Sequence, residues 1–262
     1  QQLIIKRVKR SLKPGFGILL LFLSQQFRIF SMLRLKKSMF YLYHITHMRL
    51  PSPRGDIEYI YNDEQIIVVD KPANMLSVPG RTPEKQDCLI HRVQQRFPEA
   101  RIVHRLDFST SGLMVIAQNL ESHRELSRQF QNRETEKTYV AKVYGHPDEP
   151  SGEVNLPLRC DLERRPRQII DYQQGKTAQT FWQILERYED SCRMELIPVT
   201  GRTHQLRVHM QALGHPILGD ELYAHETAFA MADRLYLHAK KLIISHPTEN
   251  NRLTFLSNSE PF

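Results

Sequence analysis

The chain has 262 residues, enough for one large domain or two small ones, and its 40% of hydrophobic residues can build a substantial core. Its 36 Lys and Arg against 29 Asp and Glu give a net charge of +7, which is typical of proteins that meet nucleic acid. The three cysteines, Cys88, Cys160 and Cys192, are far apart and show no Cys-x-x-Cys spacing. This pattern disfavours a zinc site or a disulfide framework, fits a reducing compartment, and predicts buried or half-buried free thiols.

The positive charge is concentrated at the amino-terminal end. Residues 1–48 hold nine Lys or Arg and no acid, so removing nine from 36 leaves 27 basic against 29 acidic residues, a net charge of −2. The apolar run at 16–23 is too short to span a bilayer, which takes about 20 residues. Residues 1–47 are similar to the first parts of a secretory signal or to a transit peptide. We favour a third interpretation, an extension read from upstream of a start at Met48, which lies outside the fold.

Short apolar runs predict strands in the first half of the remaining chain. These runs lie at 57–61, 66–69, 102–103 and 113–117. Residues 62–64 are turn formers and join the first two runs as a hairpin. Two helices are expected here, one capped by Asp87 and stopped by Pro98, and one capped by Asn119.

The second half is also rich in predicted strands. They lie at 138–144, 179–187, 193–199, 235–238, 242–245 and 253–256. Residues 147–175 are expected to be irregular, and two more helices are expected, one from Thr203 to Leu213 and one at 226–233. Many strands with a few separated helices indicate an α+β fold with a large, mixed, mostly antiparallel sheet flanked by helices and loops.

The polar loop at 104–112, between two apolar runs, is the centre of the functional argument. A rigid strand–loop–strand unit is a common way to position catalytic groups. Asp107 is the only acid between Glu99 and Glu121, and a lone carboxylate near the cation Arg105 is expected to stay ionised. A simple turn, in which Asp107 bonds only the backbone, explains the same residues.

Three motifs in order favour the catalytic interpretation. They are His104-Arg105-Leu106-Asp107 with Thr110-Ser111-Gly112-Leu113, Lys137-Thr138-Tyr139-Val140-Ala141, and Gly201-Arg202-Thr203-His204-Gln205-Leu206-Arg207. Together they resemble the signatures of the RluA family of RNA pseudouridine synthases. The resemblance runs from about residue 57 to about residue 256, and its beginning just after Met48 is the reason for placing residues 1–47 outside the fold.

The resemblance implies roles for six residues. Asp107 is expected to be the essential aspartate, Tyr139 to stack on the flipped uracil, and Arg207 to pair with the aspartate in a bidentate manner. Arg105 is expected to enter the RNA stack where the uridine left. Arg202 is expected to contact the substrate. His204, which shares a helix face with Arg207, is expected to do the same. The reaction needs no cofactor, and no metal-ligand spacing or dinucleotide fingerprint is visible.

The resemblance also implies a substrate. Larger members carry an amino-terminal RNA-binding module similar to ribosomal protein S4, and no such pattern precedes residue 57, so 48–262 is expected to be a single catalytic domain. Segments of the chain resemble the compact members, which modify a uridine in 23S ribosomal RNA and one in the tRNA anticodon stem-loop. A TruC-like enzyme acting on tRNA alone, and a catalytically silent RNA-binding protein with the same fold, stay open as alternatives. We expect a cytoplasmic monomer without membrane contact.

A metal-dependent nuclease or other hydrolase is the remaining alternative. It would need clustered carboxylates or His ligands, and none stand at motif spacing. The Asp107, Tyr139 and Arg207 set favours catalysis of isomerisation over binding alone.

Overall fold

The computed structural model describes residues 52–53, 55–249, 251–259 and 262. These residues all lie in one compact unit, Leu50–Phe262. The expectations for residues 1–47 and for a domain start at Met48 concern residues outside the described ones. None of the helices in the described ranges is long and apolar enough to cross a membrane.

The predicted hairpin opens the described chain. β1 (Glu58–Asn62) and β2 (Ile66–Lys71) pair antiparallel, because Asp63 accepts the N–H groups of Gln65 and Ile66 and closes the turn between them. β2 then pairs antiparallel with β4 (Ser111–Ala117), and every residue of both strands is buried. The central loop therefore leads into a strand at the heart of the protein.

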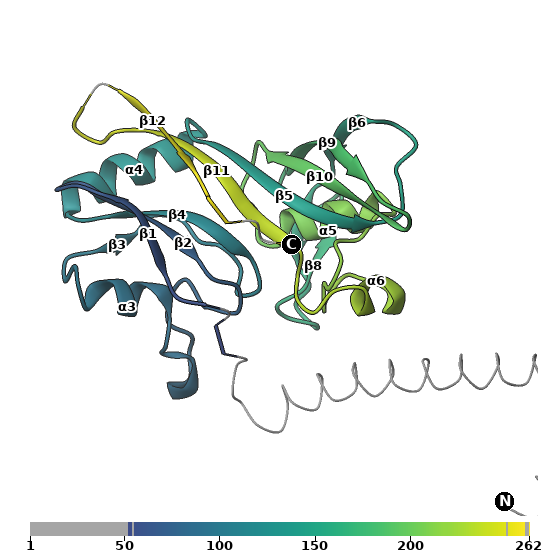
Figure 1. Cartoon of the computed structure of the whole chain (residues 1–262), viewed down its shortest axis with the longest axis horizontal. Coiled ribbons are helices and arrows are strands. Elements are labelled where there is room, and N and C mark those ends of the chain that lie inside the picture. Colours follow the sequence, from purple (N-terminus) through teal and green to yellow (C-terminus); the bar gives the residue numbers. More distant parts are fainter. Residues whose placement is uncertain (1–51, 54, 250, 260–261) are drawn as a thin grey trace, which may run out of the picture. The chain divides into compact units, whose positions relative to one another are not determined.

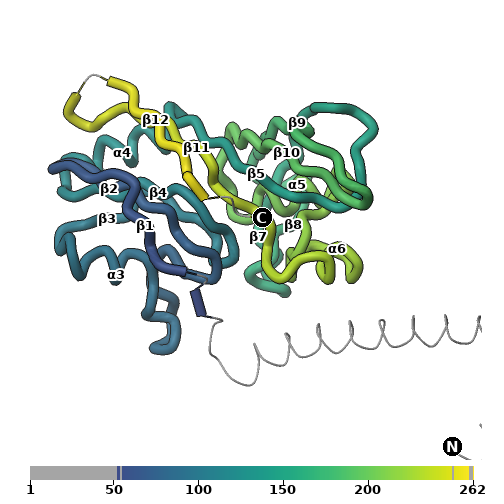
Figure 2. The backbone as a smooth tube through the Cα atoms, in the orientation of Figure 1, coloured from purple at the N-terminus to yellow at the C-terminus, as the bar shows by residue number. Residues whose placement is uncertain are grey.

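Ten strands join in one sheet within the described residues, and its core order is β1-β2-β4-β11-β5-β10-β9-β6, with β3 on β4 and β12 on β11. The remaining bounds are β3 (Arg101–Ile102), β5 (Glu136–Tyr144), β6 (Ser151–Asn155), β9 (Gln179–Arg187), β10 (Ser191–Pro198), β11 (Leu237–Ser245) and β12 (Arg252–Leu256). Only the short β11–β4 pairing is parallel. The mixed, mostly antiparallel sheet is as predicted, and Figure 2 shows the yellow β11–β12 hairpin lying along the strands that carry the site.

The alternation of side chains along β2 and β4 separates two cores. One contains Ile67, Val69, Met114 and Ile116 with Leu89 and Val93 of α3 (Leu89–Gln94). The other contains Ile66, Val68, Leu113 and Val115 with Leu126 of α4 (Leu120–Asn132). Because successive strand residues point to opposite faces, α3 and α4 cover opposite faces of this half of the sheet (Figure 1).

A third core lies under the other half of the sheet. Strands β5 and β10 pack there against Leu206 and Met210 of α5 (Gln205–Ala212). The last helix, α6 (Glu226–Ala230), lies beyond α5 in the chain and is shorter than the predicted 226–233. Helix α5 brings the third motif to the same sheet that carries the first two.

Several boundaries differ from the prediction. Residues 147–175 are not irregular throughout, since they form β6, β7 (Leu158–Cys160) and β8 (Gln168–Ile170). The runs predicted at 235–238 and 242–245 form one strand, β11, whose register shift between Ala239 and Lys241 coincides with the break in the apolar pattern. The three thiols are free, with Cys88 and Cys192 buried and Cys160 half-buried, as expected.

Two predicted helix caps are wrong and one is right. Asn119 accepts the N–H of Ser122 at the start of α4, as expected. Asp87 instead binds Arg92 through two hydrogen bonds, and α3 begins after Cys88. Thr203 does not cap α5, whose first turn begins after His204 without a side-chain cap.

Candidate active site

The loop before β4 is held in place by contacts from distant segments. Ser77 Oγ donates to the carbonyl of Leu106 (2.7 Å) and accepts its N–H (3.2 Å). Nζ of Lys71 donates to the carbonyls of Pro72 and Met75 at 2.9 Å and to that of Phe108 at 3.4 Å. These bonds fix the backbone on both sides of Asp107, so its carboxylate has a defined place.

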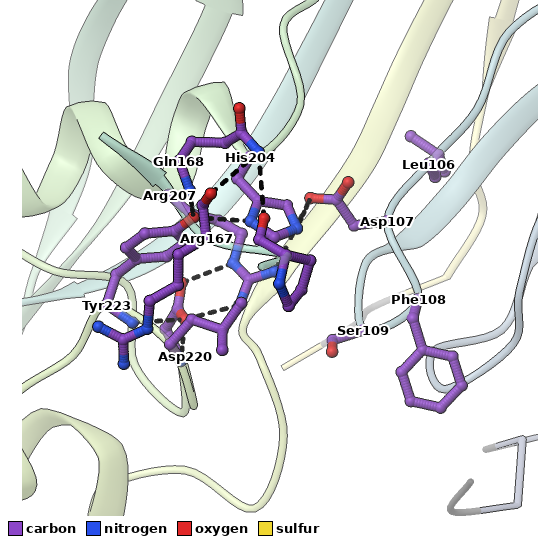
Figure 3. Close-up of polar contacts among 12 residues, drawn as sticks. Leu106, Asp107, Phe108, Ser109, Arg167, Gln168, His204, Arg207, Asp220 and Tyr223 are labelled. Atoms are coloured by element: carbon purple, nitrogen blue, oxygen red, sulfur yellow. Dashed lines mark hydrogen bonds and ion pairs between the residues drawn. The ribbon is translucent and has the colours of Figure 1, made fainter. Parts of the chain in front are cut away.

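The Asp107 carboxylate faces the start of α5. Its Oδ2 lies 3.9 Å from Nε2 of His204 and 3.9 Å from Nη1 of Arg207. Figure 3 shows Asp107 turned toward His204, while Phe108 points the other way. Two predicted site residues from the third motif therefore meet the predicted aspartate.

Arg207 is not a solvated helix charge. Its side chain is 2% exposed, and its guanidinium makes a bidentate pair with Asp220 at 2.7 Å for each bond. A third carboxylate, Glu221, accepts from Nη2 at 3.1 Å. Burial opposes the charge, but Asp220 and Glu221 outweigh it and raise the pKa of Arg207 well above its ordinary value. The expected bidentate pair with Asp107 is therefore wrong, because Asp220 takes that geometry.

His204 is a neutral donor aimed at Asp107. Burial lowers its pKa, and the charge of Asp107 offsets that effect only in part. The hydroxyl of Tyr223 accepts the N–H of Gln168 (2.8 Å), which leaves its hydrogen for Nδ1 of His204 at 2.7 Å. We infer from this network that the ring hydrogen of His204 is on Nε2, the atom that faces the carboxylate.

Tyr139 lies on β5 at the edge of two apolar cores. Burial, with the nearby charge of Asp107, raises the pKa of Tyr139, so the phenol keeps its proton at neutral pH. Its ring lines the same pocket as Asp107 and Arg207. A planar group entering the pocket can therefore contact both this ring and the carboxylate.

All six residues named from the sequence line one pocket of about 90 Å³. It opens into a groove of about 780 Å³ that shares Arg105, Asp107, Tyr139, Arg202 and His204 with it. Arg105 is exposed, and in the described part of the chain it forms no ion pair with Asp107. Arg202 is half-buried and donates from Nε to the carbonyl of Thr177 at 3.1 Å.

Residues 65–212 match the profile of the family described as RNA pseudouridylate synthase. The chain belongs to this family. The synthase is 52% identical over 202 residues to the dual-specificity RNA pseudouridine synthase RluA of Yersinia pestis, across 77% of this chain and 98% of that protein. It is also 52% identical over 197 residues to the protein of the same name from Escherichia coli strain K12, across 75% of this chain and 90% of the relative.

Solved structures agree with the family. Human RNA pseudouridylate synthase domain containing 1 superposes with a TM-score of 0.67 at 30% identity, covering 80% of this chain and 86% of its own. Human RNA pseudouridylate synthase domain containing 4 gives a TM-score of 0.62 at 25% identity, covering 77% and 88%. The synthase is thus an isomerase that acts on RNA.

The sequence argument missed several groups at the site of the synthase. Asp220, Glu221 and Tyr223 complete the surroundings of Arg207 and His204, but no local pattern ties them to α5. Lys71 did carry a signal, since it lies on the same short strand as the apolar run 66–69, two residues beyond its end. Within the described ranges, no group of three or more His, Cys, Asp or Glu could hold a metal ion.

Proposed function

We propose that this synthase converts one uridine in 23S ribosomal RNA and another in the tRNA anticodon stem-loop to pseudouridine. Two relatives with 52% identity, matched over 98% and 90% of their length, carry names that state dual specificity. The observation that carries the catalytic part is the Asp107 carboxylate in a pocket, 3.9 Å from both His204 and Arg207.

The pocket suits a uracil that has left the RNA stack. Bases inside a stack cannot be reached by a side chain, so the uridine must be flipped into the pocket first. The exposed Arg105 at the mouth can fill the vacated place, since its planar guanidinium stacks and donates hydrogen bonds. Arg202 lines both the pocket and the groove and is placed to contact the same nucleotide.

Asp107 would start the reaction by attack on C1′ of the ribose or on C6 of the base, and we leave that choice open. In either case the N1–C1′ bond breaks, the uracil turns, and a C5–C1′ bond forms. The proton of C5 leaves and N1 takes up a proton, so atoms balance without an added reactant. Arg207 and the Nε2 hydrogen of His204 would stabilise and orient the carboxylate. Tyr139, which lines the same pocket, would hold the base by stacking, and its phenol would help to remove the C5 proton.

Replacement of the aspartate tests the proposal. Asp107→Asn keeps the size of the side chain but removes the nucleophile, so tritium release from RNA labelled at C5 of uridine should fall by roughly four orders of magnitude or more. The variant should bind the same RNA and unfold at the same urea concentration as the parent. Tritium release at the parental rate would disprove the role of Asp107.

The substrates need a separate experiment. Pseudouridines are mapped in ribosomal and transfer RNA from cells with the synthase, cells without it, and cells with Asp107→Asn. Dual specificity predicts one missing site in each RNA class in the last two strains. Loss from tRNA alone would support a TruC-like enzyme, and an unchanged map with retained RNA binding would support a silent binding protein.

We also propose that residues 48–262 act as a single catalytic domain and as a monomer. We further propose that the enzyme acts in the cytoplasm, on the RNA substrates named above. Sedimentation equilibrium across a hundredfold range of protein concentration checks the monomer, since a mass that doubles with concentration would contradict it.

A further inference from the structure

The groove in front of the pocket has an unusual balance of charge. Among the residues that line it, four are cations and Asp107 is the only carboxylate. The cations are Arg105, Arg133, Lys137 and Arg202. Two of them, Arg105 and Arg202, already have proposed roles at the flipped nucleotide. The other two, Arg133 and Lys137, are not explained by those roles.

Several arginines elsewhere on the body are paired with an acid. Arg92, Arg101, Arg128, Arg159, Arg164 and Arg252 each lie within 3.1 Å of a carboxylate oxygen. Arg133 and Lys137, by contrast, make no ion pair with any described residue. Their side chains therefore carry charge that no acid in the described part of the chain compensates.

Lys137 is surrounded by neutral and cationic groups. Its ammonium lies 5.9 Å from the centre of the Phe130 ring, which stacks on His104 at 4.4 Å. The Nε2 atom of His104 accepts the N–H of Val115 (3.0 Å), and burial together with Lys137 lowers the pKa of His104 to about 3, so this ring is neutral. Burial, and then the charge of Arg133, lowers the pKa of Lys137. An anion would relieve both effects.

Both cations are held in place by the backbone. Arg133 ends α4 in the left-handed conformation (φ 61°), and its N–H donates to the carbonyls of Gln129 and Phe130. Lys137 lies on β5 two residues before Tyr139, so both side chains point to the same face. Lys137 lines the inner pocket as well as the groove, whereas Arg133 lines only the groove. The pair therefore marks the path from the mouth of the pocket outward.

We propose that Lys137 and Arg133 together bind one phosphate of the RNA backbone next to the flipped uridine. The inference rests on the proposed function, since it concerns the same RNA. A phosphate carries the charge that two adjacent uncompensated cations require, while the carbonyl oxygens of uracil are neutral. The position of this phosphate follows from Lys137. Because Lys137 lines both the pocket and the groove, RNA that leaves the pocket through the groove passes it.

A neutral phosphate analogue tests this assignment directly. In an anticodon stem-loop RNA, each phosphate within two nucleotides of the target uridine is replaced singly by a methylphosphonate, which removes the charge. Binding is measured for the parent, Lys137→Met, Arg133→Met and Arg128→Met. Arg128 is the matched control. It lies on α4, the helix that Arg133 ends, but it is paired with Glu125 and Glu134.

One methylphosphonate position should weaken binding to the parent about tenfold. The same position should change binding to Lys137→Met and Arg133→Met less than twofold, because the contact is already lost. Each of these variants should also flatten the slope of log K against log salt by about 0.7, the value for one single-strand phosphate contact. Arg128→Met should bind like the parent and show the full methylphosphonate effect.

Additive effects at every position, in both variants, would overturn the assignment. Urea unfolding of each variant identifies loss of fold, and the exposed Arg133 provides a second test if Lys137→Met unfolds. The parent must release tritium from the same RNA. If the parent releases tritium and the effects of variant and methylphosphonate on binding are additive, only the phosphate site is refuted. If the parent releases no tritium, the proposed function is refuted.

Discussion

A single buried guanidinium organises the residues of the site. Arg207 is bound by Asp220 and Glu221 and lies 3.9 Å from Asp107. Because the first two carboxylates already bind its charge, Arg207 can orient Asp107 without holding it in a bidentate pair. The reactive carboxylate thus stays free to move toward a substrate.

The link between Ser109 and Glu221 leads to a prediction about catalysis. Ser109 Oγ donates to Oε1 of Glu221 (3.2 Å), which also accepts from Arg207, so the bond ties the Asp107 loop to α5. Ser109→Ala should lower the single-turnover rate about fivefold, from loss of about 1 kcal/mol of hydrogen bonding, without changing RNA affinity. Ser151→Ala, which changes an exposed serine on β6, serves as the control. A parental rate in Ser109→Ala would show that the tie is irrelevant to catalysis.

The sequence predicted which residues meet but not which of them pair. Motif order brought Asp107, Tyr139 and Arg207 to one pocket, because each motif belongs to an element of the same sheet or its covering helix. The bidentate partner of Arg207 lies 13 residues further along, outside any motif spacing. Which acid reaches a given guanidinium depends on tertiary packing, and local patterns do not record it.

At the scale of the elements, the short β4–β11 pairing positions the loop. Ser111 and Gly112 pair with His238 and Ala239, and Gly112 adopts a φ of 116°, which is reserved for glycine. A Cβ on Gly112 would collide with the backbone of Ala239. The end of the catalytic loop therefore depends on a close approach between two strands.

Substitution of this glycine should be severe. Gly112→Ala should destabilise the synthase by at least about 3 kcal/mol, since it adds a backbone clash to left-handed strain. Gly214→Ala separates the backbone strain from the clash. Gly214 has a φ of 90° but nothing within 4 Å of an added Cβ, so this substitution should reduce the free energy of unfolding by about 1 kcal/mol. Urea unfolding measures both, and equal losses would mean that the strands can separate without cost.

Local chemistry explains which elements could be predicted. The β1–β2 hairpin and the Asn119 cap depend on residues at most three positions apart, so their signals are complete in the sequence. The pairing of Ser111 with His238 joins residues 127 positions apart, and no short pattern announces it. Asp87 failed as a cap because Arg92 offered its carboxylate a stronger partner.

At the scale of the whole molecule, the complete burial of the Lys71 side chain disfavours its charged form. This side chain is wholly inaccessible at the end of β2, where it reaches the Phe108 carbonyl of the catalytic loop. Complete burial lowers its pKa from 10.5 to about 7, although Asp107 and Asp70 act in the opposite direction. The charge of one interior group therefore couples the stability of the fold to pH.

The sign of this coupling follows from the two pKa values. Between about pH 7 and 10.5 the unfolded chain keeps a proton that the folded chain releases, so the Lys71 contribution to stability rises with pH. The unfolding free energy of the parent should gain about 1.4 kcal/mol per pH unit relative to Lys71→Met across this window. Urea titrations at pH 7, 8 and 9 check it, and parallel pH profiles would show that Lys71 stays charged when folded.

At this scale, the composition of the chain did not predict the charge of the groove. The net charge of the chain after residue 48 is −2, yet the groove before the pocket is lined by four cations and one acid. The local balance arises where α4, β5 and the loop before α5 converge, and a total over the sequence cannot show it.

The parallel contact between β4 and β11 has a consequence for protein synthesis. The loop that carries Asp107 is translated before the strand that fixes its end, which begins at Leu237. A nascent chain on the ribosome cannot complete this sheet until β11 has emerged, and non-local pairing of this kind is slow. Modification of RNA by a polypeptide still being made is thereby delayed until β11 has been translated.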